Sequence, residues 1–91
     1  MSMVKASYII KNKLGLHARA ATKLVHVAAR FPCDVVLVRD GQRANAKSVM
    51  GVLLLCGARG TRIEVEAKGD SAADAVKEIG LLIDDYFGEG E

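Results

Sequence analysis

The chain has 91 residues, of which 51% are hydrophobic, so it is long enough to form one small domain with its own core. Thirteen basic and eleven acidic residues give a net charge of +2, and no basic block suggests binding to a nucleic-acid backbone. The cysteines, Cys33 and Cys56, form no C-x-x-C motif, which favours reduced thiols in the cytoplasm over a disulfide. The first ten residues predict neither a signal peptide nor a membrane span.

The first third of the chain predicts a strand followed by a helix. Residues 3–10 alternate polar and apolar side chains, which is the period of a half-buried strand. After a loop at residues 11–16, apolar residues recur at i, i+3, i+4 and i+7. This pattern predicts an amphipathic helix over residues 18–30, and Pro32 ends it.

The middle of the chain predicts a hairpin and a short helix. A β-branched run at residues 35–38 leads through Asp40-Gly41, a favoured hairpin turn, into a second strand at residues 42–46. Ser48 is a suitable N-cap for a short helix that runs to about Cys56.

The last third predicts a strand and a longer helix. Strict alternation over residues 61–67 is typical of a strand. The helix begins at residues 69–71, where Ser71 and Asp74 approximate a capping box. Its buried face is expected to comprise Ala72, Ala75, Val76, Ile79, Leu82, Ile83 and Tyr86.

This order of elements predicts an α+β fold. Four antiparallel strands with three helices on one face form an open-faced sandwich of order βαββαβα. We expect a single domain over residues 1–88 and a frayed C-terminus at residues 89–91, because the run Gly88-Glu89-Gly90-Glu91 is expected to extend into solvent.

The segment around His17 carries the first functional signal. Gly15 predicts a turn immediately before the helix, which places His17 at the helix start. The free N–H groups and the positive dipole end of a helix N-terminus hold anions, and Arg19 lies close enough to assist. This arrangement suits a histidine that carries a phosphoryl group, although a partly exposed helix-start histidine without such a role is the alternative.

Two motifs together indicate a family. The segment Gly15-Leu16-His17-Ala18-Arg19-Ala20-Ala21 is followed thirty residues later by Lys47-Ser48-Val49-Met50-Gly51-Val52. In this pattern the chain resembles HPr, the histidine-containing phosphocarrier of the bacterial phosphoenolpyruvate-dependent phosphotransferase system. The order of elements, the Asp40-Gly41 hairpin and the strand between Gly60 and Gly69 also resemble that family.

The resemblance implies roles for His17 and Arg19. His17 is expected to accept a phosphoryl group on Nδ1 from phosphorylated enzyme I and to donate it to enzyme IIA proteins. Arg19 is expected to stabilise phosphoryl charge through its planar paired donors. The family commonly has proline where Ala20 stands, so we expect a less rigid turn here. We expect a monomeric phosphoryl carrier without a metal or cofactor, rather than a stand-alone enzyme.

Ser48 has a structural and a regulatory interpretation, and the two are compatible. As an N-cap its hydroxyl contributes about 1 kcal/mol to stability. By resemblance it corresponds to the serine that HPr kinase/phosphorylase modifies, and a phosphate there would repel an anionic phospho-enzyme.

The short helix after Ser48 is apolar all around, although only one side can face the sheet. With Val52 and Leu55 directed inward, an exposed patch remains. We expect that patch to dock partners together with residues at the start of the first helix, unless a rotated short helix buries all of its side chains. The expected docking residues are Ala18, Ala20, Val49, Met50 and Leu53.

Two other functions stay open at this stage. The first is a regulatory HPr paralogue that serves nitrogen or metabolic control instead of sugar uptake. The second is a small enzyme of the acylphosphatase type, which also uses an arginine near a phosphate but predicts a strand near the C-terminus.

Overall fold

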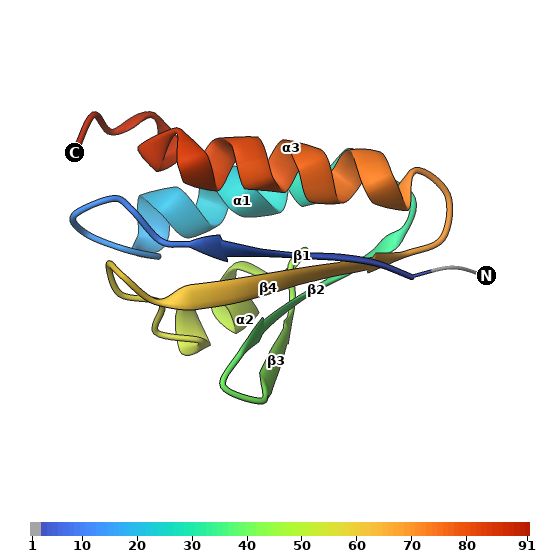
Figure 1. The fold of residues 1–91 in the computed structure, drawn as a ribbon, viewed down its shortest axis with the longest axis horizontal. Helices are drawn as coiled ribbons and strands as arrows, with labels where there is room; N and C mark the ends of the chain where they lie inside the picture. Colours follow the sequence, from blue (N-terminus) through green and yellow to red (C-terminus); the bar gives the residue numbers. More distant parts are fainter. Residues whose placement is uncertain (1–2) are drawn as a thin grey trace.

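The computed structural model describes residues 3–91, which form one antiparallel sheet, three α-helices and a short C-terminal 3₁₀ turn (Figure 1). The predicted order βαββαβα is confirmed. None of the helices in this range combines the length and hydrophobicity of a bilayer span. The elements are β1 (Met3–Ile9), α1 (Ala18–Ala29), β2 (Asp34–Arg39), β3 (Gln42–Asn45), α2 (Val49–Leu54), β4 (Arg62–Lys68), α3 (Ala72–Asp84) and η1 (Tyr86–Gly88).

The sheet places the last strand in its interior. The strand order is β1-β4-β2-β3, and every neighbouring pair is antiparallel. The predicted hairpin joins β2 to β3 through Asp40 and Gly41, whose φ angles of +47° and +82° fit the turn type that matches strand twist. β4 lies between β1 and β2, and its alternating sequence follows from the face of the sheet that packs on the core, where Ile63, Val65 and Ala67 are buried.

The core lies between one face of the sheet and the helices. In Figure 1, α1 and α3 run side by side over that face, and α1 also contacts α2. Alternate residues of β2 and β4 supply the sheet side of the core, and Val52 and Leu55 bring α2 and the residue after it into the same cluster. The open-faced α+β sandwich is therefore confirmed.

Two predictions at the ends of α3 are wrong. Ser71 adopts a left-handed conformation with φ of +63°, and within residues 3–91 its side chain caps no helical N–H, so no capping box forms with Asp74. Tyr86 is exposed, whereas Phe87 is fully buried. Both residues have positive φ angles, so the helical period stops after Asp84 and the turn directs the next aromatic ring inward.

The loop before α1 is hydrogen-bonded to the segment that follows α2. The backbone N–H of Leu16 donates to the carbonyl oxygen of Gly57 over 2.8 Å. Gly15 has a φ of +67°, and a Cβ at this position would lie 2.4 Å from the same carbonyl oxygen. Gly15 is therefore needed both for its backbone conformation and for this close approach.

We predict that Gly15→Ala lowers the free energy of unfolding by about 3 kcal/mol, because backbone strain and the clash with Gly57 add together. The matched control is Gly60→Ala, at a position with φ of +87° where an added Cβ would have nothing within 4 Å. The control is expected to lose about 1 kcal/mol from strain alone. Urea unfolding of both variants tests the difference, and equal losses would contradict the importance of the Gly57 contact.

Candidate functional site

His17 is the residue from which α1 begins. Its backbone is extended, with φ of −74° and ψ of 176°, and its carbonyl oxygen accepts the first helical bond, from the N–H of Ala21 over 2.8 Å. Within the described residues its side chain makes no cap bond, so the ring is available for other contacts. The first N–H groups of a helix have no acceptor inside it, so positive potential develops where His17 lies.

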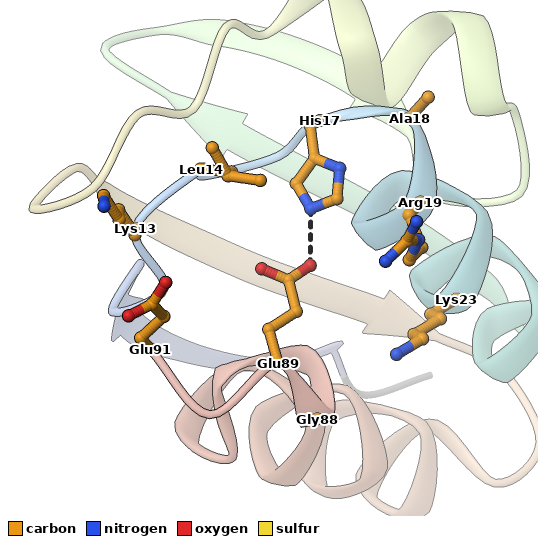
Figure 2. A pocket seen from close by; sticks show the side chains of 9 residues that line it. All are labelled: Lys13, Leu14, His17, Ala18, Arg19, Lys23, Gly88, Glu89 and Glu91. Atoms are coloured by element: carbon orange, nitrogen blue, oxygen red, sulfur yellow. Dashed lines mark hydrogen bonds and ion pairs between the residues drawn. The ribbon is translucent and has the colours of Figure 1, made fainter.

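The ring of His17 opens into a cavity of about 640 Å³ (Figure 2). Its side chain is 26% exposed, which leaves it accessible to a partner while restricting its motion. Three cationic residues and two glutamates line the cavity besides the histidine, so cations outnumber carboxylates there. The lining residues are Lys13, Leu14, His17, Ala18, Arg19, Lys23, Gly88, Glu89 and Glu91.

Arg19 is brought together with His17, as predicted from the motif. Both line the same cavity, and Figure 2 shows both side chains beside the start of α1. Arg19 is exposed, so its guanidinium is accessible to an incoming anionic group. Permanent charge and a planar donor fork are the properties that phosphoryl recognition needs.

The C-terminal tail returns to this cavity, and the prediction that residues 89–91 are frayed is wrong for Glu89. Its side chain is only 13% exposed, and its carboxylate hydrogen-bonds to Nε2 of His17. The physical reason is that hydrogen bonds to main-chain oxygens hold the tail in place. The Nζ of Lys23 donates to the carbonyl oxygen of Phe87 over 2.6 Å, and the N–H of Lys13 donates to the main-chain oxygen of Glu91 over 2.9 Å.

Asn12 holds the other carboxylate oxygen of Glu89. The Nδ2 group of this fully buried side chain donates to Oε1 of Glu89 over 3.0 Å and to the carbonyl oxygen of Gly15 over 2.8 Å. Burial by itself would raise the pKa of Glu89, but the hydrogen bonds from Asn12 and His17 and nearby positive charge outweigh it and hold that pKa below its usual range. Glu89 is therefore ionised at neutral pH.

Ser48 lies where the sequence places it, immediately before α2. Its Oγ accepts a hydrogen bond from the N–H of Gly51 over 3.1 Å, so the predicted N-cap is confirmed. The side chain is half-buried, and it lines a separate surface hollow with residues of β3 and α2.

The apolar surface of α2 differs in part from the prediction. Met50 is 67% exposed, as expected, but Val49 and Leu53 are half-buried against the core. Leu54, which was not predicted to be exposed, is 72% exposed. The exposed apolar surface therefore consists mainly of Met50 and Leu54.

At the start of α1, the two alanines predicted to dock partners separate. Ala18 is exposed and lines the cavity of His17. Ala20 is fully buried in the core, so its assignment as a docking residue is wrong. The cause is helical geometry, because Ala20 faces the sheet along with Ala21 and Leu24.

Sequence reasoning missed Asn12 and Glu89 as parts of the site. Their side chains meet across 77 positions of sequence, and no local period links such residues. One weak signal was present, because Phe87 is a large apolar residue beyond the end of the predicted apolar face. A buried Phe87 requires the tail to turn back, and the flanking Gly88 and Gly90, both with positive φ, allow it to do so.

The chain is similar to known proteins over nearly its whole length. A family model described as the PTS HPr component phosphorylation site matches residues 4–85. Phosphocarrier protein HPr of Neisseria meningitidis serogroup A is 46% identical over 89 residues, which cover 98% of this chain and 100% of the relative. Phosphocarrier protein NPr of Shewanella violacea is 40% identical over 89 residues and 98% of each chain.

A solved structure is similar to this chain in both fold and sequence. The crystal structure of HPr-C-His from Thermoanaerobacter tengcongensis superimposes with a TM-score of 0.91 at 37% identity, covering 94% of this chain and 97% of that one. The family model spans most of the chain and includes both His17 and Ser48. On this evidence, the chain belongs to the HPr family of phosphocarriers of the phosphotransferase system.

Proposed function

We propose that His17 accepts a phosphoryl group from phosphorylated enzyme I and passes it to enzyme IIA proteins for sugar uptake. The observation that carries this proposal is the His17 ring at the N-terminus of α1, in one cavity with Arg19 and two lysines, in a chain of the HPr family. The protein acts in the cytoplasm as a monomer and needs no metal or cofactor. It is a carrier, and its partners supply most of the catalysis.

The cavity suits reversible transfer of an anionic group. A neutral imidazole has a nitrogen lone pair that can attack phosphorus, and the bond that forms can be broken again by the next acceptor. The free N–H groups of the first helical turn and the charge of Arg19 are in place to stabilise the phosphoryl oxygens. A carrier needs this stabilisation to be moderate, because the group must also leave.

Docking occurs through the apolar surface beside the site. Met50 and Leu54 of α2 are exposed, and α2 packs against α1, at whose start Ala18 and His17 lie. Exposed apolar side chains next to a reactive group are typical of a protein–protein contact. The flexible thioether of Met50 suits a surface that must bind several partners.

Regulation at Ser48 is part of this proposal. HPr kinase/phosphorylase would add a phosphate to the hydroxyl that caps α2, at the base of the apolar docking helix. The added charge of about −1.5 to −2 would oppose the docking of a phosphorylated, anionic partner.

A regulatory paralogue is the second candidate. The 40% identity with phosphocarrier protein NPr of Shewanella violacea, over 98% of each chain, supports it. The rates of phosphoryl transfer to purified enzyme IIA proteins of the sugar type and of the regulatory type separate the two candidates. Faster transfer to the sugar type supports a role in sugar uptake, and faster transfer to the regulatory type supports the paralogue. An acylphosphatase-type enzyme predicts a strand near the C-terminus. In the described residues β4 is the last strand and α3 follows it, which disfavours that alternative.

Replacing His17 tests the function itself. Incubation with enzyme I and labelled phosphoenolpyruvate is expected to give an acid-labile, base-stable label on the wild-type protein and none on His17→Ala. His26→Ala is the matched control, because His26 is exposed in the last turn of α1, and it is expected to label normally. Equal labelling of the wild type and His17→Ala would sink the proposal.

The planar fork of Arg19 is expected to matter beyond its charge. Arg19→Lys keeps the positive charge but loses paired donation, and we expect the rate of transfer from enzyme I to fall about 10-fold. Arg30→Lys, in the exposed residue that follows α1, should leave the rate unchanged. Stopped-flow or quench-flow rates provide the comparison, and an unaffected Arg19→Lys protein would show that charge alone suffices.

Charge and capping at Ser48 can be separated by two substitutions. Ser48→Asp retains an N-cap oxygen but adds negative charge, and we expect about 10-fold slower phosphorylation by enzyme I at near-normal stability. Ser48→Ala removes the cap and is expected to lose about 1 kcal/mol of stability while it transfers phosphate normally. Rates and urea midpoints are measured on both proteins, and a normal rate for Ser48→Asp would refute charge repulsion as the regulatory mechanism.

A further inference from the structure

We infer that Glu89 is a positioning residue for phosphoryl transfer, whose carboxylate keeps the proton on Nε2 of His17 and leaves Nδ1 as the attacking nitrogen. This inference rests on the proposed function of His17. It assigns a role in the reaction to the C-terminal tail.

The pairing of ring and carboxylate determines where the ring proton lies. Figure 2 shows Nε2 of His17 directed at the carboxylate of Glu89, while Nδ1 points away from it, toward the start of α1. An ionised carboxylate can only accept a hydrogen bond, so Nε2 must be the donor. A neutral imidazole has one ring proton, so the lone pair is then on Nδ1.

The carboxylate is itself held in place, which a positioning group requires. Its Oε1 accepts from the buried Asn12, and the same amide group holds the carbonyl oxygen of Gly15, two residues before His17. The backbone N–H of Glu89 donates to the carbonyl oxygen of Tyr86 over 2.9 Å. Asn12 therefore holds the loop before α1 and the C-terminal tail together. Glu89, which Asn12 positions, in turn orients the ring of His17.

The transfer step balances with Glu89 in this role. The Nδ1 lone pair attacks phosphorus and forms the N–P bond, while the bond from phosphorus to the donor breaks and its electron pair leaves with the donor. Nε2 keeps its proton throughout, so His17 releases no proton to solvent. Positive charge that develops on the ring during attack is stabilised by the adjacent carboxylate.

The kinetic test uses Glu89→Ala, Glu89→Gln and the matched control Glu78→Gln in the full chain. Glu78 makes the same change of charge possible in a half-buried residue of α3, and it is not among the residues that line the cavity of His17. We expect the maximal rate of phosphorylation by enzyme I to fall about 10-fold in Glu89→Ala and less in Glu89→Gln, which keeps an acceptor oxygen. The KM for each variant, and the rate of Glu78→Gln, should stay unchanged.

The result that would overturn the inference is equally specific. A Glu89→Ala protein that is phosphorylated at the wild-type rate or faster would mean that the tail is passive or acts as a brake. A loss confined to KM would mean that Glu89 contacts the partner instead of positioning the ring. Urea unfolding identifies any variant whose rate falls because it is partly unfolded, and Glu89→Gln then provides the decisive comparison.

A spectroscopic readout needs no partner protein. ¹⁵N spectra of a neutral imidazole ring report which nitrogen bears the proton. We expect the Nε2–H form of His17 in the wild type and a mixture of both forms in Glu89→Ala, with His26 unchanged as the internal reference. An unchanged His17 spectrum would overturn the inference alone, whereas a wild-type protein that enzyme I cannot phosphorylate would overturn the proposed function.

Discussion

The close approach of Gly15 to the carbonyl oxygen of Gly57 is the constraint on which the site depends. It requires a glycine, because any Cβ would lie 2.4 Å from that oxygen, and it allows the N–H of Leu16 to donate to it. The loop that ends at His17 is thus held against the segment that follows α2. His17 and α2 are therefore linked through this contact, although more than thirty residues separate them in sequence.

The C-terminal tail contributes residues to the same site. Phe87 anchors it in the core, and beyond this anchor Glu89 reaches both Asn12 and His17. Its carboxylate lies among cations, which favours ionisation, and it occupies the ring nitrogen that faces away from the start of α1. A negative group so close to a phosphoryl carrier is compatible with transfer because it contacts the opposite side of the ring from the helix N-terminus.

Much of the fold could be predicted because it follows from local periods and turn chemistry. β4 alternates strictly, α1 has an apolar stripe, and Asp40-Gly41 suits the hairpin turn that the structure shows. The errors occur where backbone conformation overrides the period. After α3, Tyr86 and Phe87 both adopt left-handed backbone conformations. As a result Phe87 is buried, and Tyr86, which was expected to be buried, is exposed.

The site was predictable only in its local half. The motif around His17 predicts the helix start and the proximity of His17 and Arg19, since these residues are neighbours in sequence. Glu89 could not be found this way, because its contacts depend on how the tail turns after α3.

The central claim is that His17 reacts through Nδ1 because Glu89 engages Nε2. The most direct measurement is the coupling between ³¹P and the ring nitrogens of the phosphorylated protein, uniformly labelled with ¹⁵N. The account predicts a coupling to Nδ1 of His17, with the proton still on Nε2. Phosphorus bonded to Nε2, or to any residue other than His17, would contradict it.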